Sequence, residues 1–162
     1  MLSWRTLRPI LAFVILVVLH YTLRPVLGWR TSVDFLVLAL LLASVRMRPG
    51  AAAVLGFAIG LVADSLSVGS FGSAALAMSV VGFAASWLRA VVFAENLVLH
   101  ALFFFAGKWL FDILFLIVER RVRGLDLVFQ LFIWSPLTAM VTALAGIVVV
   151  ILLRPMLDSQ PA

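Results

Sequence analysis

The sequence has no cysteine and very little charge. Of its 162 residues, 12% are charged and 65% are hydrophobic, whereas ordinary soluble domains are about 25% charged. The absence of cysteine excludes disulfides, thiolate nucleophiles and cysteine-ligated metal sites. An apolar fraction this large cannot be buried in one soluble core of this size. The composition therefore predicts one integral membrane domain over residues 1–162.

Residues that support catalysis are also scarce. The two histidines, His20 and His100, fall in different hydrophobic stretches, and neither an HExxH motif nor a nucleophile elbow is present. Ser70 lies in a Gly-Ser-Phe-Gly sequence that superficially resembles a serine protease loop, but serine and glycine are ordinary turn residues. We expect no enzymatic activity, no cofactor and no bound metal.

The net charge of +5 does not indicate a nucleic-acid partner. The arginines stand at the ends of hydrophobic stretches rather than in one patch, as expected for residues that anchor a protein at the membrane surface. The arginine-rich sequence at 120–123 could contact lipid headgroups, with solvated anchoring as the simpler interpretation. Membrane lipid is therefore an expected partner, and nucleic acid is not.

Six hydrophobic stretches of helical length predict an all-α, six-span transmembrane helical bundle. About 20 apolar residues cross a hydrocarbon core of about 30 Å. The predicted spans are residues 9–27, 32–45, 49–66, 73–92, 97–118 and 126–153.

Two of these spans are unusual. The second reaches only roughly 21 Å at about 1.5 Å per residue, so it requires either a locally thin bilayer or a buried position. Ser32 can cap this helix, with Asp34 in its first turn. In the sixth span, Pro136 predicts a kink, and the part up to Trp134 is expected to lie along the membrane interface.

Six spans place both termini on the same side of the membrane. The early basic residues Arg5, Arg8, Arg46 and Arg48 favour a cytoplasmic N-terminus, and the connection between the third and fourth spans has no basic residue. The arginines at 120–123 favour the opposite orientation. We expect a multi-pass protein of the bacterial inner membrane with both termini in the cytoplasm.

A lysine and an aspartate, Lys108 and Asp112, lie near the middle of the fifth span. A charge at the bilayer centre costs at least roughly 2.5–3.5 kcal/mol on insertion scales, so it usually has a partner. The spacing of four residues puts both side chains on one helix face, where they can pair. His100 lies on the same face and could extend this polar line towards Glu119. A structural network is the favoured interpretation, and a proton path is the alternative.

Small residues line one face of the third span, which ends with a carboxylate. Because their spacing is four, these residues share a face that permits close approach of another backbone. Packing between the third and fourth spans is the favoured role, and docking of another protein's helix is the alternative. The residues are Ala52, Gly56, Gly60 and Asp64, facing a similar stripe of Ala75, Ser79, Gly82 and Ser86 in the fourth span.

The region from residue 48 to about 90 has a more specific pattern. Arg48-Pro49-Gly50 is followed by Gly56-Phe-Ala-Ile-Gly60-Leu-Val-Ala-Asp64-Ser-Leu-Ser-Val-Gly69-Ser-Phe-Gly72. This resembles the signature region of the MreD family of bacterial rod shape-determining proteins. The resemblance implies a non-enzymatic inner-membrane component of the cell-elongation machinery that helps to regulate peptidoglycan synthesis. The implied partners are MreC, the MreB filament, RodA and a class B penicillin-binding protein.

The MreD fold also resembles the six-helix substrate-binding S components of energy-coupling-factor vitamin transporters, which supplies an alternative function. Many S components carry an Ala-x-x-x-Ala face on their first helix, but here Ala12 is followed by Leu16 at that spacing. The few polar groups near the end of the third span do not form the convergent set that a small-molecule site requires. These groups are Asp64, Ser65, Ser67 and Ser70. The vitamin-transporter function is therefore the less favoured alternative.

Overall fold

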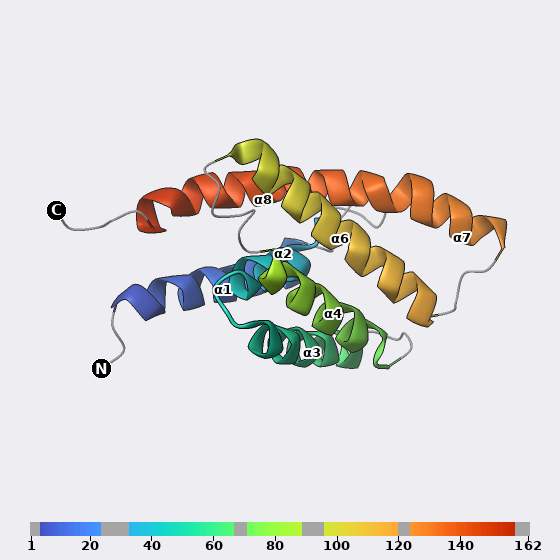
Figure 1. Cartoon of the computed structure of the whole chain (residues 1–162), viewed down its shortest axis with the longest axis horizontal. Helices are drawn as coiled ribbons and strands as arrows, with labels where there is room; N and C mark the ends of the chain where they lie inside the picture. The colour runs from blue at the N-terminus through green and yellow to red at the C-terminus, as the bar shows by residue number, and fades with distance from the viewer. Residues whose placement is uncertain (1–3, 24–32, 67–70, 89–95, 120–123, 158–162) are drawn as a thin grey trace.

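A computed structural model describes residues 4–23, 33–66, 71–88, 96–119 and 124–157, and every element in these ranges is a helix (Figure 1). The elements are α1 (Trp4–Leu23), α2 (Phe35–Ser44), α3 (Pro49–Ser65), α4 (Ser73–Trp87), α6 (Leu97–Glu119), α7 (Leu125–Phe129), the π-helix η1 (Gln130–Trp134) and α8 (Ser135–Leu157).

Local sequence explains where two of these helices begin. The side chain of Asp34 accepts a hydrogen bond from the Val37 N–H, so Asp34 is the N-cap of α2 rather than a first-turn residue. Pro49 stands in the first turn of α3, where the N–H that proline lacks would have no partner within the helix. Ser32, the residue expected to cap α2, lies outside the described residues.

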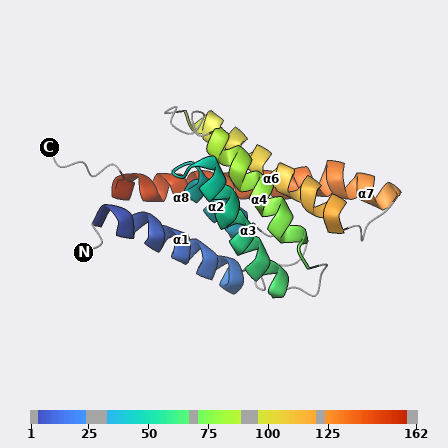
Figure 2. The same cartoon turned by 60° about the horizontal axis from the view of Figure 1, so that its bottom comes forward.

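The short helix α2 forms the centre of the bundle. It has 10 residues, and all side chains from Phe35 to Leu41 are buried. At about 1.5 Å per residue such a helix is roughly half as long as a hydrocarbon core is thick. Of the two possibilities for this short span, a buried position is the one observed, since α1, α3, α4, α6 and α8 all contact α2 (Figure 2).

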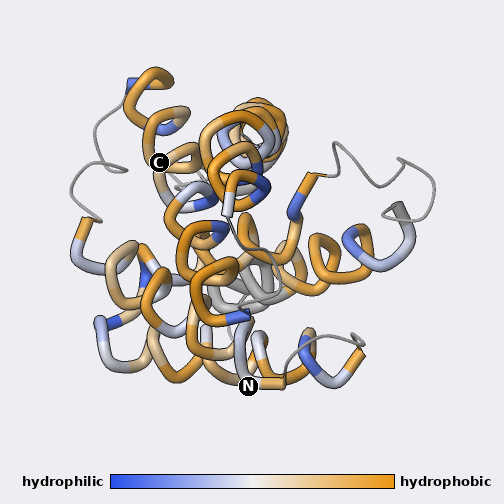
Figure 3. Tube along the Cα trace, turned by 90° about the vertical axis from the view of Figure 1, so that its right-hand side faces the viewer, coloured by the Kyte–Doolittle hydropathy of each residue, from blue (hydrophilic) through white to orange (hydrophobic). Residues whose placement is uncertain are grey.

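The helices are built mainly of apolar residues, as Figure 3 shows by the predominance of hydrophobic colour along the trace. Within the described residues, two helices are long and apolar enough to cross a membrane, Leu97–Glu119 and Leu125–Leu152, and four shorter apolar helices accompany them. Exposed large side chains such as Val54 on α3, Leu102 on α6 and Leu144 on α8 are suited to contact lipid. That all six segments cross the membrane remains a prediction.

The helix bounds differ from the predicted spans at several places. The helix α4 ends at Trp87 rather than at residue 92, and α8 continues to Leu157 rather than ending at residue 153. The helix α1 begins at Trp4 rather than at residue 9, and α2 covers 35–44 rather than 32–45. The predicted sixth span is a succession of α7, η1 and α8. The start of α1 and the end of α8 lie at the same end of the molecule, whereas α7 lies at the opposite end (Figures 1 and 2).

The π-helix explains how the chain accommodates Pro136. The Ser135 N–H donates to the carbonyl of Gln130, five residues earlier, instead of to that of Leu131. Pro136 has no N–H and cannot bond the Leu131 carbonyl either. The indole Nε1 of Trp109 on α6 donates to that carbonyl at 3.3 Å. The predicted discontinuity at Pro136 is thus a π-turn stabilised by a neighbouring helix.

Candidate functional site

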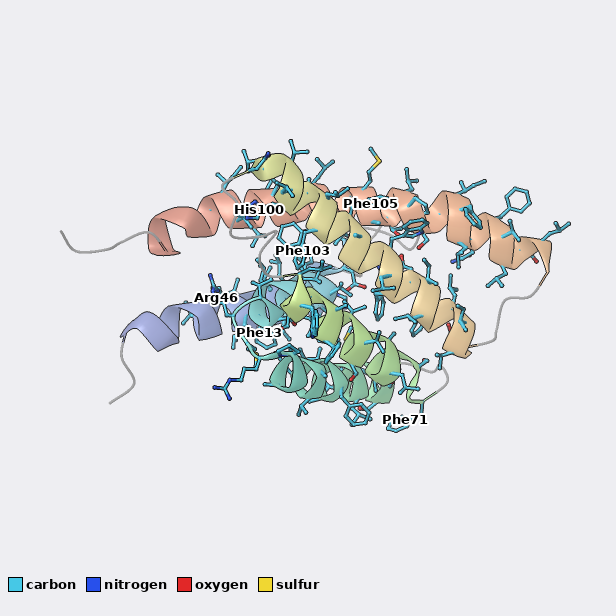
Figure 4. All side chains as sticks on the ribbon, in the orientation of Figure 1. Phe13, Arg46, Phe71, His100, Phe103 and Phe105 are labelled. Carbon is cyan, nitrogen blue, oxygen red and sulfur yellow. The ribbon has the colours of Figure 1, made fainter. Side chains whose placement is uncertain are left out.

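The small-residue face of α3 packs against α4 within the chain. The buried residues of α3 are Ala52, Gly56, Gly60 and Asp64, the four that the sequence places on one face. On the α4 side, Ala75, Gly82 and Ser86 are buried, and the Ser86 hydroxyl donates to the carbonyl of Met47 at 2.7 Å. The two helices form an antiparallel hairpin with Phe71 exposed at its turn (Figure 4).

Backbone contacts between α3 and α4 leave no room for side chains at three glycines. A Cβ atom at Gly56 would lie 2.2 Å from the carbonyl oxygen of Met78, and one at Gly60 would lie 2.4 Å from the Cα of Ala75. A Cβ at Gly82 would lie 2.5 Å from the carbonyl oxygen of Ala52. Because these neighbours are backbone atoms, they cannot move aside as a flexible side chain could. Gly56, Gly60 and Gly82 therefore lie where the backbones of α3 and α4 come close together.

Asp64 links the end of α3 to the start of α4. Its carboxylate accepts hydrogen bonds from the backbone N–H groups of Gly72 at 3.0 Å, Ala74 at 3.1 Å and Ala75 at 3.0 Å. The first N–H groups of a helix have no partners within it, and the helix N-terminus carries partial positive charge. Gly72, the N-cap residue itself, has a φ of 98° and no side chain to supply such an acceptor. A buried carboxylate from the preceding helix therefore caps α4.

These contacts bear on the alternative that another protein's helix docks on the α3 glycines. The helix α4 covers Gly56 and Gly60, so a partner would have to displace α4 or contact a different surface of the hairpin. In the described structure the face packs within the fold, so while α4 stays in place this face can affect a partner through the shape of the α3–α4 pair.

A polar centre lies elsewhere, between α1, α2, α6 and α8. Lys108 on α6 donates to Asp112 Oδ1 at 2.5 Å, the pair that the spacing of four predicts. It also donates to Asp34 Oδ2 at 3.1 Å. The ammonium lies 4.9 Å from the centroid of the Phe111 ring, a cation–π arrangement. The Lys108 side chain is only 8% exposed, so these contacts replace water around its charge.

Asp34 is the carboxylate of this centre that the sequence did not indicate. In the sequence, a place at the start of a helix is enough to explain an aspartate at position 34. Its partner Lys108 is 74 positions away in the chain. One oxygen receives the Lys108 ammonium, while the other caps α2 through the Val37 N–H. The backbone N–H of Asp34 donates to the Thr142 hydroxyl of α8 at 3.3 Å.

Hydroxyl groups of α8 complete the surroundings of Asp112. Ser135 donates to Asp112 Oδ2 at 2.7 Å, and the Thr138 hydroxyl lies 3.3 Å from the same oxygen. Ser135 directly follows the π-helix, so the centre connects α6 to the point where η1 becomes α8. The arrangement holds charges of both signs away from lipid and joins helices that are distant in sequence.

The histidines are placed differently from the sequence-based expectation. His20 on α1 is buried, and its Nδ1 lies 3.6 Å from Asp34 Oδ1. His100, which could have extended the line of Lys108, lies near the start of α6 (Figure 4). Its Nδ1 is instead 2.9 Å from the carbonyl oxygen of Asn96, just before the helix. The polar centre therefore extends from Lys108 towards α1 rather than along α6. Over the described part of the chain, no group of three or more His, Asp or Glu residues is arranged to hold a metal.

Comparison with known proteins decides the family. The family described as "rod shape-determining protein MreD" matches residues 3–159, nearly the whole chain. The chain belongs to the MreD family. No match was found among curated proteins or among solved structures.

Membership in the MreD family connects this chain to the determination of rod shape in bacteria, as a membrane protein that takes part in a complex with other Mre proteins. The match does not support the vitamin-transporter alternative. The resemblance to the S-component fold rests on the sequence alone. The match extends well beyond the signature region at residues 48–90 and includes both the α3–α4 interface and the polar centre.

Proposed function

We propose that this MreD protein is a non-enzymatic scaffold of the cell-elongation machinery that binds MreC and helps to regulate peptidoglycan synthesis. RodA, a class B penicillin-binding protein and MreB are further proposed partners. The observation that carries this proposal is the family match over residues 3–159. Support also comes from the described polar side chains at Asp34, Asp64, Lys108 and Asp112, whose hydrogen bonds join helices to one another.

The α3–α4 hairpin is the part of the chain that we connect to partner binding. Its inner face is closed by backbone contacts at Gly56, Gly60 and Gly82, and its outer face carries exposed apolar side chains such as Phe57 and Phe83. A bulky residue at Gly60 would separate the two helices and change the shape of that outer face. Replacing Asp64 would change the same outer face, because the Asp64 carboxylate fixes the start of α4.

Co-purification from native membranes tests this proposal. We expect Gly60→Leu and Asp64→Leu to reduce recovery of MreC at least about tenfold, which corresponds to a loss of about 1.4 kcal/mol of binding free energy. Rod-shaped host cells that carry either variant should become round. Gly50→Ala is the matched control, because a Cβ at Gly50 meets nothing within 4 Å.

Each result has a defined meaning when the variants are compared at equal abundance in the membrane. Normal rods and full MreC recovery with Gly60→Leu and Asp64→Leu would remove the hairpin from partner binding. Failure of the unaltered chain to recover MreC would contradict the scaffold proposal itself. Loss of vitamin uptake with normal cell shape would favour the transporter function.

We further propose that both termini are cytoplasmic and that residues 65–72 face the outside. The support is the set of early basic residues, together with the uncharged connection that follows α3. In this cysteine-free chain, Ser70→Cys should react with a membrane-impermeant maleimide in intact cells, whereas Ser159→Cys should not. The reverse labelling pattern would invert the orientation.

A further inference from the structure

The π-turn before Pro136 inserts one extra residue into the last helix of the chain. The Ser135 N–H donates to the Gln130 carbonyl, five residues earlier, whereas an α-helix would direct it to the carbonyl of Leu131. Each residue of an α-helix turns the chain by about 100°. Residues 125–134, here called the α7–η1 arm, are therefore rotated by about 100° from the orientation that an unbroken α-helix would give them.

Two features of the sequence act on the form of this turn. In an α-helix the ring of Pro136 would clash with the carbonyl four residues earlier, so the proline favours the open π-turn. Opening the turn takes the Ser135 N–H away from the Leu131 carbonyl, which then needs another donor in apolar surroundings. The indole Nε1 of Trp109 supplies that donor at 3.3 Å, and its ring lies beside that of Phe105 with centroids 6.1 Å apart. The π register thus depends on a contact from α6 that an α-helix would not need.

The arm has apolar side chains for two different registers. Leu127 and Leu131, here called the inner pair, are spaced by four and are the only partly buried side chains of the arm, whose other residues are exposed. Closing the π-turn would shift the arm by one residue, so that Val128 and Phe132, the outer pair, would take the places of the inner pair. The outer pair is also apolar and is 51% and 64% exposed in the structure. Either register can therefore turn an apolar pair towards the bundle.

The beginning of α8 is fixed, whereas the arm has few contacts with other helices. Ser135 is buried, and its hydroxyl donates to Asp112 Oδ2 on α6 at 2.7 Å. The arm packs mainly on itself and on α8, and α7 lies at the opposite end of the molecule from the start of α1 (Figure 1). A change of register would therefore rotate the arm while the polar centre stays in place.

We propose that the π-turn is a hinge with two registers and that the Trp109 indole holds it in the π register. While the indole bonds the Leu131 carbonyl, the inner pair faces the bundle. When that bond is lost, the turn closes into an α-helix and the outer pair takes its place. Trp109 is in this respect a positioning residue. The hinge concerns the fold of this chain and is independent of MreC binding.

Oxygen accessibility of spin labels tests the hinge, because it reports which face of the arm is turned towards protein. In this cysteine-free chain, Leu127→Cys and Val128→Cys each give one labelling site in the full chain in lipid nanodiscs. With Trp109 present, the label at 127 should be the less accessible to oxygen. Trp109→Phe keeps an aromatic ring but removes the N–H donor. We expect it to reverse the order, so that the minimum of accessibility moves by one residue, to 128.

Trp87→Phe is the matched control, because it makes the same chemical change on α4 at a side chain that is 71% exposed. This variant should leave the label at 127 the less accessible. Trp109→Phe combined with Pro136→Ala removes both features that favour the π register, so it should also place the minimum at 128.

The remaining outcomes would overturn the proposal. If the order is unchanged in the combined variant, the arm has no second register. If the order is reversed in the combined variant but unchanged in Trp109→Phe, the indole does not hold the hinge. Labels that become equally accessible at both positions in Trp109→Phe would show that the arm frays instead of changing register.

Discussion

Lys108→Met should lower the free energy of unfolding by about 3–5 kcal/mol, the typical cost of removing one partner from a buried ion pair. The substitution leaves the carboxylates of Asp34 and Asp112 without the ammonium that lies between them. Methionine preserves most of the aliphatic volume, so the loss is mainly electrostatic. Unfolding by SDS in mixed micelles measures the effect.

Asp112→Asn is the informative comparison for this substitution. It removes one of the two carboxylates that contact Lys108 and leaves Lys108 paired with Asp34, so we expect a smaller loss of about 1–2 kcal/mol, largely from weaker hydrogen bonds. The double variant Lys108→Met with Asp112→Asn should be more stable than Lys108→Met alone, because only Asp34 then remains charged. A double variant that is less stable than Lys108→Met by the full cost of Asp112→Asn, so that the two losses add, would show that the two residues are not coupled.

The sequence predicted the contacts whose partners are close along the chain or recur along a helix face. Lys108 and Asp112 are one helical turn apart, so their pairing follows from helix geometry. The spacing of four from Ala52 to Asp64 likewise identifies the buried face of α3. The short second span, with too few residues to cross a bilayer, was correctly expected to allow a buried position.

The rest depends on tertiary structure that helix periodicity does not contain. Asp34 looked like an ordinary residue at a helix start, and only the packing of α2 on α6 brings it to Lys108. His20 lies on a different helix, and no spacing relates it to Asp34. The polar line that His100 could have extended is not the contact observed, because His100 contacts the carbonyl of Asn96, just before its own helix. Pro136 predicted a discontinuity but not its form, a π-turn in which the Leu131 carbonyl accepts a hydrogen bond from Trp109 of α6.

Asp64→Leu should destabilise the α3–α4 hairpin by at least about 3 kcal/mol, because each buried N–H that loses its partner costs about 1–3 kcal/mol. The Asp64 carboxylate accepts hydrogen bonds from three such groups, at Gly72, Ala74 and Ala75. The N-cap residue is a glycine, which has no side chain that could replace the lost acceptor. The loss should appear both in SDS unfolding and as faster hydrogen exchange of the Ala74 and Ala75 amides.

Asp64→Asn separates the hydrogen bonds from the charge. The amide oxygen of asparagine can still accept hydrogen bonds from the start of α4. Its NH₂ group, however, is a donor facing N–H donors, and the favourable interaction between a negative charge and the helix N-terminus is lost. We expect Asp64→Asn to lower the free energy of unfolding by about 1–2 kcal/mol, which is less than the loss expected for Asp64→Leu. Ser65→Ala is the neighbouring control; it removes a hydroxyl that bonds carbonyls of its own helix and should change stability by about 0.5 kcal/mol or less. If Asp64→Leu were as mild as Ser65→Ala, the capping of α4 by α3 would not be what holds the two helices in register.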